Sequence, residues 1–256
     1  MSPDQRPPAA GGVAGWSPDG GPGLETLTGL LAGCDFTVVG RLPWSSNLTY
    51  LVTLATGADP PVGAVYKPGA GEQSLWDFPD RLFRREAAAY TLSEALGWGL
   101  VPPTVVRHDG PMGEGSLQLF VAADYSEHYF TLFDEGRDES VLRTLCVFDI
   151  VANNADRKSG HVLRGPDGRL WGIDHGLCFH RQPKLRTVIW DFAGDPLPDE
   201  LLGDLDRLAA DPPEGLAGLL SEAEQEAVVE RTRRLVDSGV FPEPTGDRPP
   251  YPWPLI

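Results

Sequence analysis

The stretch FDIVANNADRKSGHVL, residues 148–163, decides how the rest of the chain is interpreted. Its first residues complete an apolar run with helical spacing, residues 140–154, which predicts a buried helix beginning near Ser140. Two asparagines, an aspartate, an arginine and a lysine follow directly. Polar residues just after a buried helix are typical of the floor of a cleft, because the helix end can orient them without placing them in the core. We therefore expect this stretch to carry the chemistry of the protein.

Asp156 is the central candidate, either as a general base or as a residue that orients a hydroxyl nucleophile. Asn154, Arg157 and Lys158 are expected to surround it with hydrogen-bond donors. A purely structural interpretation of Asp156 as a loop cap stays open.

His161 and Asp174 form a second candidate pair. Residues 160–174 predict a small hairpin, with His161 at the start of one strand and Asp174 at the end of the next. Two adjacent strands would bring His161 and Asp174 close enough to share one divalent ion. Alternatively, His161 is an ordinary strand-end histidine and Asp174 a turn residue.

The first half of the chain is rich in predicted strands. These cover residues 36–42, 48–54, 62–68, 104–109 and 115–122. Between the third and fourth lies a helix within residues 78–97, for which Asp80 is the expected cap and Gly97 marks the end.

Lys67 and Glu86 are predicted to form an ion pair. Lys67 ends the third strand, and Glu86 lies on a helix face that also carries Leu82, Phe83 and Tyr90. A carboxylate on an apolar face requires a cation, and this pair would hold the lysine toward a phosphate group. An exposed strand-end lysine is the alternative.

The turn between the first two strands is a candidate anion-binding nest. It contains Ser45, Ser46 and Asn47 after Trp44, and successive backbone N–H groups with two hydroxyls can bind an anion. Most such turns only reverse the chain.

The order of these elements predicts an α+β fold with two lobes. We expect a disordered leader over residues 1–22, a β-rich N-terminal lobe over 23–122 and a mainly helical C-terminal lobe over 123–256. The helices of the second lobe include residues 199–210 and 221–239. The proline-rich end is expected to pack as an extended strap through Tyr251, Trp253, Leu255 and Ile256.

Composition excludes several classes of partner. A formal charge of -16 argues against nucleic acid and against stable membrane association, because both require a positive surface. The absence of a signal peptide and of a long apolar run predicts a cytoplasmic protein, as do three widely spaced cysteines, which also offer no zinc site. Only three lysines occur, Lys67, Lys158 and Lys184, so an anionic ligand needs a locally built site.

Residues 153–163 and 172–179 resemble the catalytic and metal-binding loops of the phosphatidylinositol 3-/4-kinase-like superfamily, especially the type II phosphatidylinositol 4-kinases. The chain as a whole resembles small kinase-like proteins of high-GC bacteria. The resemblance implies a two-lobed protein-kinase-like fold that binds ATP with Mg²⁺ or Mn²⁺. It places Lys67 at the nucleotide phosphates with Glu86 as its partner, Asp156 as the catalytic aspartate and Asp174 as the metal ligand. It also places Gln118, Leu119, Phe120 and Val121 at the adenine.

Two features depart from that pattern. No glycine-rich loop precedes Lys67, so the turn with Ser45, Ser46 and Asn47 would serve in its place. His161 stands where the superfamily has an asparagine, and an imidazole suits Mn²⁺ or Zn²⁺ better than Mg²⁺.

We therefore predict a phosphotransferase acting on a hydroxyl acceptor. Arg157, Lys158, Lys184 and Arg186 are candidates for contacts with phosphate or acceptor. The segment after Asp174 lacks a long basic run, which favours a protein or small-molecule acceptor over a membrane lipid. A nucleotide-binding pseudokinase and an AMP-transferring enzyme of the same fold are the alternatives.

Overall fold

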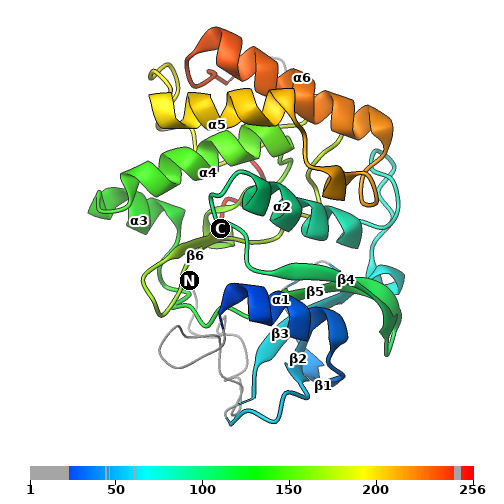
Figure 1. The fold of residues 1–256 in the computed structure, drawn as a ribbon. Helices are drawn as coiled ribbons and strands as arrows, with labels where there is room; N and C mark the ends of the chain where they lie inside the picture. Colours follow the sequence, from blue (N-terminus) through cyan, green and yellow to red (C-terminus); the bar gives the residue numbers. More distant parts are fainter. Residues whose placement is uncertain (1–22, 44, 46, 60, 245–248) are drawn as a thin grey trace.

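The computed structural model describes residues 23–256 except 44, 46, 60 and 245–248. The predicted leader, residues 1–22, lies outside the described residues. Figure 1 shows a twisted sheet in the N-terminal half of the chain and stacked helices in the C-terminal half. The predicted α+β class is therefore confirmed, while the division into lobes at residue 122 stays a prediction.

The sheet is antiparallel with the strand order β1-β2-β3-β5-β4. Its strands are β1 (Phe36–Arg41), β2 (Tyr50–Leu54), β3 (Gly63–Pro68), β4 (Thr104–Gly110) and β5 (Gly113–Leu119). In β3, Ala64 and Tyr66 are fully buried and pack with Leu27 and Leu31 of helix α1 (Leu24–Gly33). Side chains alternate along a strand, so Lys67 lies on the opposite face. Helix α1 was not predicted from the sequence.

Helix α2 (Phe83–Ala95) follows β3 after the 3-10 turn η2 (Gly69–Gly71) and a loop. The predicted cap, Asp80, is wrong. The carboxylate of Glu72 accepts hydrogen bonds from the backbone N–H of Leu82 at 2.8 Å and of Phe83 at 2.7 Å. The loop folds back, so a residue ten positions upstream satisfies the free N–H groups of the first turn. Gly97 follows the helix with φ +70°, a conformation that glycine adopts without strain.

Helices dominate the C-terminal half. They are α3 (Tyr129–Glu135), α4 (Glu139–Ala152), α5 (Asp199–Ala210) and α6 (Glu222–Ser238), with the 3-10 turns η3 (Ser159–His161) and η4 (Glu214–Leu216). The predicted hairpin is present as β6 (Val162–Arg164) and β7 (Leu170–Gly172). Helix α3 was not predicted. In the described part of the chain, no helix is long and apolar enough to cross a membrane.

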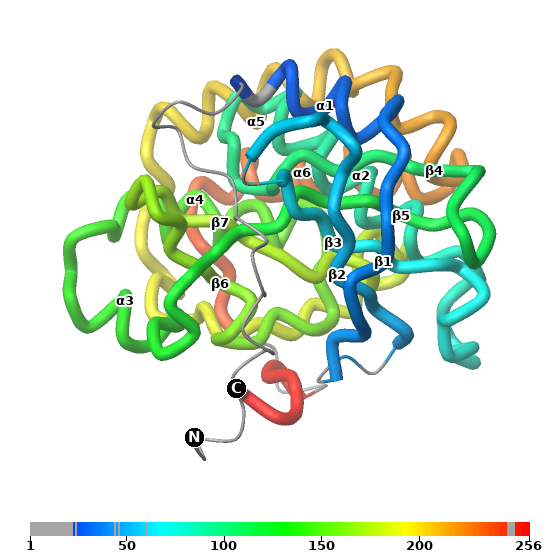
Figure 2. The backbone as a smooth tube through the Cα atoms, turned by 90° about the horizontal axis from the view of Figure 1, so that it is seen from below, coloured from blue at the N-terminus to red at the C-terminus, as the bar shows by residue number. Residues whose placement is uncertain are grey.

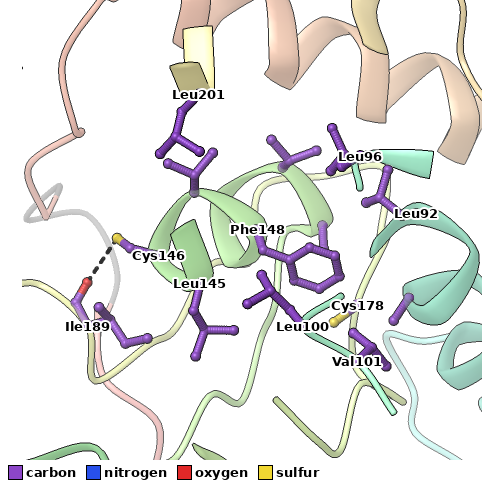
Figure 3. Close-up of a cluster of buried hydrophobic side chains, with 14 of the residues drawn as sticks. Leu92, Leu96, Leu100, Val101, Leu145, Cys146, Phe148, Cys178, Ile189 and Leu201 are labelled. Carbon is purple, nitrogen blue, oxygen red and sulfur yellow. Dashed lines mark hydrogen bonds between the residues drawn. The ribbon is translucent and has the colours of Figure 1, made fainter. Parts of the chain in front are cut away.

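Helix α2 belongs to the core of the C-terminal half as well as to the sheet. Phe148 of α4 is fully buried in a cluster that includes Leu92 of α2 and Leu96, the residue that caps the end of α2 (Figure 3). Figure 1 shows α2 between the sheet below it and helices α5 and α6 above it, and in the view from below the strands overlap these helices (Figure 2). The helix that carries Glu86 is therefore packed from both sides.

A buried ion pair also joins α2 to α6. The guanidinium of Arg85, which is only 3% exposed, contacts the carboxylate of Glu224. Glu224 also accepts hydrogen bonds from the backbone N–H and hydroxyl of Ser221, at 2.9 and 2.8 Å, in the capping box of α6. The pair fixes α2 relative to the last helix.

We expect Arg85→Met to lower the free energy of unfolding by about 3 to 5 kcal/mol, because it leaves the Glu224 carboxylate without its cation in the interior. Urea denaturation measures the change. Arg84→Met, at the neighbouring position, removes no ion pair seen among the described residues and should change stability by less than about 0.5 kcal/mol. Equal losses in the two variants would contradict the role of the buried pair.

Candidate active site

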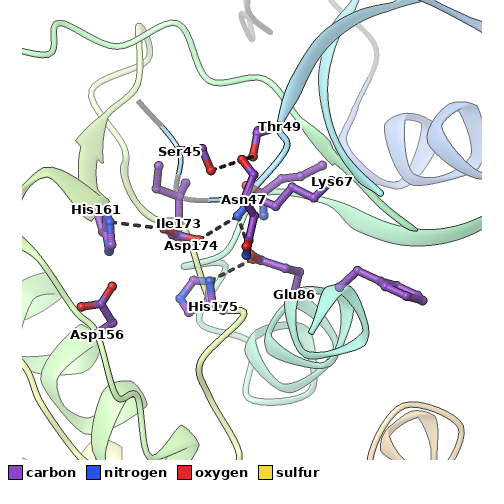
Figure 4. Close-up of polar contacts among 12 residues, drawn as sticks. Ser45, Asn47, Thr49, Lys67, Glu86, Asp156, His161, Ile173, Asp174 and His175 are labelled. Atoms are coloured by element: carbon purple, nitrogen blue, oxygen red, sulfur yellow. Dashed lines mark hydrogen bonds and ion pairs between the residues drawn. The ribbon is translucent and has the colours of Figure 1, made fainter. Parts of the chain in front are cut away.

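Four charged or polar side chains form a continuous row between the two halves of the chain (Figure 4). The ammonium group of Lys67 contacts the carboxylate of Glu86 and lies 2.9 Å from Oδ1 of Asp174. The other oxygen of Asp174 lies 3.4 Å from Nε2 of His161. The row joins β3 and α2 to the loop after β7 and to η3. The sequence-predicted contacts of Lys67 with Glu86 and of His161 with Asp174 are thus both present.

The electrostatics of the row favour its charged form. Burial alone would lower the pKa of Lys67, but the negative charges of Asp174 and Glu86 raise it well above its usual range. The charge of Lys67 holds the pKa of Asp174 well below its usual range, against the effect of burial. Lys67 is therefore cationic and Asp174 anionic at neutral pH. Asp174 also has a left-handed backbone, with φ +61°, a strained conformation that occurs at functional sites.

His161 and Asp174 fit a shared divalent ion. Burial lowers the pKa of His161 to about 4, so the ring is neutral at pH 7. Nδ1 accepts a long hydrogen bond, 3.4 Å, from the backbone N–H of Lys158, so Nε2 becomes a ligand only when the ring proton moves to Nδ1 and replaces that bond. Two ligands that are each about 2.1 Å from an ion lie about 3 Å apart at a right angle, close to the observed 3.4 Å. Among the described residues, no group of three or more histidine, cysteine or carboxylate side chains is placed to hold a metal. The remaining ligands would come from the nucleotide phosphates and water.

Asp156 lies beside this row, near His161, in Figure 4. Its carboxylate is 27% exposed and lies 3.0 Å from the ammonium group of Lys158. Burial raises the pKa of Asp156, while Lys158 opposes that shift. Asp156 and Lys158 thus form a half-exposed acid–cation pair next to the candidate metal ligands.

The predicted orientation of Asn154 and Arg157 is wrong, because their side chains do not surround the Asp156 carboxylate. Asn154 is fully buried, donates to Oδ1 of Asp149 at 2.9 Å and accepts only from the backbone N–H of Asp156 at 3.0 Å. Arg157 is also fully buried and bonds both oxygens of Asp149, at 2.9 to 3.1 Å. Neither can touch a phosphate or an acceptor, so both act only by positioning the loop.

Sequence reasoning missed the residues at the centre of this network. Asp149, His175 and Thr187 are all fully buried. Arg157 donates to Nε2 of His175 at 2.7 Å and to the carbonyl of Ile173 at 2.8 Å, and Thr187 donates to Asp149 at 3.2 Å. The backbone N–H of His175 bonds Glu86 at 2.9 Å. An aspartate within the apolar run FDIV was the available signal, since a buried carboxylate needs a cation.

Of the apolar candidates for the adenine, Phe120 alone lies in the small cluster beside Val65. Leu51 and Phe120 are buried together, with Leu42 and Val65 packed against them. Val65 and Lys67 are two residues apart in β3 and so share a face of the sheet. Leu119 instead packs on the opposite face of the sheet with the buried residues under α1, and Val121 packs against Trp171.

The polar candidates near this cluster are partly engaged elsewhere. The side chain of Gln118 donates to Thr104 at 2.8 Å, and its backbone lies in β5 between β3 and β4, where it is paired with Val65 and Thr104. Thr49 donates to Ser45 at 2.8 Å, and Asn47 accepts from the backbone N–H of Gln73 at 2.9 Å. Ser46 and Trp44 lie outside the described residues. Whether this turn binds an anion stays a prediction.

Lys184 does not lie free for a ligand. Its ammonium group is 2.6 Å from Asp77 and 5.4 Å from the ring centre of Phe78, both in the loop before α2. The Phe78 ring in turn packs edge-on against His180. Lys184 therefore ties the segment after Asp174 to the N-terminal half, whereas Arg186 is exposed.

Comparison with known proteins identifies the family. No protein-family model matches the chain. Protein Rv2133c of Mycobacterium tuberculosis (strain ATCC 25618 / H37Rv) is 42% identical over 265 residues, covering 89% of this chain and 94% of the relative. The chain belongs to the family of protein Rv2133c.

Solved structures show which fold this Rv2133c-family protein has. The crystal structure of the Golgi casein kinase with Mn/ADP bound matches it with a TM-score of 0.53 at 13% identity, over 88% of this chain and 80% of that chain. The structure of hydra Fam20 with sugar matches with a TM-score of 0.49 at 14% identity, over 84% and 87%. The match to the Golgi casein kinase confirms the predicted two-lobed kinase-like fold, and at 13% identity the likeness extends to the fold alone.

In this Rv2133c-family protein we expect Asp149→Asn to lower the free energy of unfolding by about 3 to 5 kcal/mol, because it leaves Arg157 buried without a counter-charge. Asp109→Asn is the matched control. Asp109 also pairs with a buried arginine, Arg107, but its carboxylate is 68% exposed and Arg107 keeps two backbone carbonyls. Asp109→Asn should lower the free energy of unfolding much less than Asp149→Asn, because water screens an exposed pair. Urea denaturation of both variants measures the difference, and similar losses would contradict the network.

Proposed function

We propose that the protein is an ATP-dependent phosphotransferase that moves the γ-phosphoryl group to an acceptor hydroxyl. The observation that carries the proposal is the row of Glu86, Lys67, Asp174 and His161, with Asp156 beside it. A cation held between two carboxylates, a carboxylate–imidazole pair and a separate half-exposed carboxylate are the groups that phosphoryl transfer requires from a protein.

The apolar cluster around Phe120 and the lysine have complementary tasks in this proposal. Leu51, Val65 and Phe120 would bind the adenine ring on the face of the sheet that Lys67 shares. Lys67 would contact the phosphates, because its contact with Glu86 fixes the position of its ammonium group beside Asp174. The exposed fraction of the Lys67 side chain, 21%, leaves it accessible to a ligand.

Asp156 would act on the acceptor. It would orient the attacking hydroxyl and accept its proton, while Lys158 at 3.0 Å stabilises the negative charge on the transferred group. Asn154 and Arg157 act only through the backbone of this loop.

Asp174 and His161 would hold a divalent cation, Mg²⁺ or Mn²⁺. When bound, such an ion neutralises charge on the nucleotide phosphates. Asp174 can serve the ion with Oδ2 while Oδ1 keeps its contact with Lys67.

Within kinase-like folds, the motifs at residues 153–163 and 172–179 support a place in the phosphatidylinositol 3-/4-kinase-like superfamily. They do not specify a lipid acceptor. A charge of -16 disfavours nucleic acid and anionic membranes as partners, so we propose a protein or small-molecule acceptor.

Two substitutions separate nucleotide binding from transfer. ATP with Mg²⁺ or Mn²⁺ at about 100 times its dissociation constant should raise the melting temperature of the wild-type protein by about 5 to 10 °C. Lys67→Met should abolish most of this shift, because it removes the phosphate cation. Asp156→Asn should keep the shift, because it preserves shape, but should lower transfer at least a hundredfold.

Autophosphorylation followed by mass spectrometry measures transfer without a known acceptor, and the added mass distinguishes a phosphoryl group from AMP. Arg234→Met, an exposed substitution on α6, controls for charge loss. No shift with either metal in the wild-type protein would exclude the proposed function, and nucleotide binding without any transfer would leave a pseudokinase.

His161 offers a test of metal preference. We expect His161→Asn to shift the preference from Mn²⁺ toward Mg²⁺, because an amide oxygen is a harder ligand than an imidazole nitrogen. Nucleotide affinity measured by calorimetry with each metal gives the ratio. An unchanged ratio would show that His161 is not a ligand and that Asp174 holds the ion without it.

A further inference from the structure

The segment after Asp174 runs beside the loop that carries Asp156. The backbone N–H of Arg186 donates to the carbonyl of Asn154 at 2.9 Å, and Arg157 donates to the carbonyl of Arg186 at 3.0 Å. Arg157 and Thr187 form a parallel bridge. The two segments are therefore paired locally like neighbouring strands.

This pairing fixes which side chains share a face. Arg157 and Thr187 both reach inward to Asp149. Successive side chains of an extended segment point to opposite sides. Asp156 precedes Arg157, and Arg186 precedes Thr187, so both side chains point outward. Their exposure agrees, since Asp156 is partly exposed and Arg186 is exposed. Arg186 thus lies on the same face of the pairing as the candidate catalytic carboxylate.

Arg186 differs from the other cations near this face. Lys158 is held by Asp156, and Lys184 is held by Asp77. Among the described residues, no carboxylate forms an ion pair with Arg186. Residues 175–190 contain no acidic residue at all in a chain of charge -16. Arg186 therefore has no acidic neighbour within its own segment.

Residues 249–256, the terminal strap, hold the segment from its other side. The carbonyl of Pro250 accepts from the backbone N–H of Thr187 at 3.0 Å and from Trp190 Nε1 at 3.2 Å, and the carbonyl of Leu255 accepts from the N–H of Ser159 at 2.8 Å. These bonds occupy backbone donors that an extended peptide would need for pairing beside the loop. A compact acceptor fits this arrangement better than a polypeptide.

We infer that Arg186 binds an anionic group of the acceptor, and that the acceptor is a small hydroxyl compound bearing its own carboxylate or phosphate. The inference rests on the proposed phosphoryl transfer at Asp156. A guanidinium forms two parallel hydrogen bonds with either anion and remains charged at any relevant pH. The backbone N–H and carbonyl of Arg186 both bond the loop that carries Asp156, and the strap bonds the next residue, Thr187, so anion binding orders only the Arg186 side chain. Arg186 then sets which acceptors present their hydroxyl to Asp156.

Anion protection tests the site without knowledge of the acceptor. The wild-type protein, saturated with a non-hydrolysable ATP analogue and Mg²⁺, is treated with phenylglyoxal with and without inorganic phosphate, and modification of each arginine is followed by peptide mass. Phosphate should slow modification of Arg186 about tenfold or more and leave the exposed Arg181, in the same segment, unchanged. Equal rates at Arg186 with and without phosphate would overturn the inference. The protection experiment is repeated without the ATP analogue. Protection of Arg186 in that case would show the anion site even if the protein did not bind nucleotide, so failure of the proposed function and failure of this inference give different results.

Kinetics with paired acceptors test the specificity role. Glycerol and glycerol 3-phosphate, glucose and glucose 6-phosphate, and serinamide and serine differ by one anionic group within each pair. For any anionic compound of these pairs that receives the phosphoryl group, Arg186→Gln should raise KM about 10- to 100-fold with little change in kcat. Arg181→Gln should change neither constant. Neutral members used as well as anionic ones, or a loss confined to kcat, would contradict the assignment. Nucleotide binding and autophosphorylation that persist in Arg186→Gln would then show that the proposed function stands without it.

Discussion

The arrangement of the candidate active site depends on the buried ion pair between Asp149 and Arg157. Both side chains are completely buried, and charges in the interior persist only when their hydrogen-bonding groups are satisfied. Arg157 meets this requirement by bonding Asp149 of α4 and the carbonyl of Ile173, directly before Asp174. One guanidinium therefore sets the position of the Asp156 loop relative to Asp174. The polarity of residues 153–158 is thus partly structural. Asn153, Asn154 and Arg157 are buried and hold the loop in place, whereas Asp156 and Lys158 are partly exposed.

The second constraint is the placement of α2. Its carboxylate Glu86 bonds both Lys67 and the backbone of His175, while Arg85, its neighbour in sequence, is bound to Glu224 of α6. Adjacent residues on one helix thus face the row of the candidate active site and the C-terminal helices. Because α2 is packed on both sides, the Lys67–Glu86 pair exists before any ligand arrives. Binding then orders little of the backbone, which preserves affinity.

Sequence patterns predicted the elements whose periodicity is strong and the contacts between regular elements. Lys67 and Glu86 belong to a strand and a helix, whose geometry limits where their side chains can point. Arg157 lies in an irregular loop, where direction depends on partners such as Asp149 and His175, so its orientation was predicted wrongly. The Asp80 cap failed for a related reason, since a loop folding back from Glu72 leaves no periodic signal. Helix α1 could have been predicted from the sequence, because its leucine residues have helical spacing.

The charges of the site indicate the form in which a nucleotide can enter it. All three lysines of the chain lie at or near the site, and each is already paired with a carboxylate, Lys67 with Asp174, Lys158 with Asp156 and Lys184 with Asp77. The site therefore offers little net positive charge, and free ATP would bring its phosphates toward carboxylates in a medium of low dielectric constant. A metal–nucleotide complex reduces this repulsion, because the bound cation offsets the negative charge of the phosphates. The lysines offset little of it, since each is already paired with a carboxylate. Under the proposed function, a chain this acidic would therefore need the metal for nucleotide binding as well as for phosphoryl transfer.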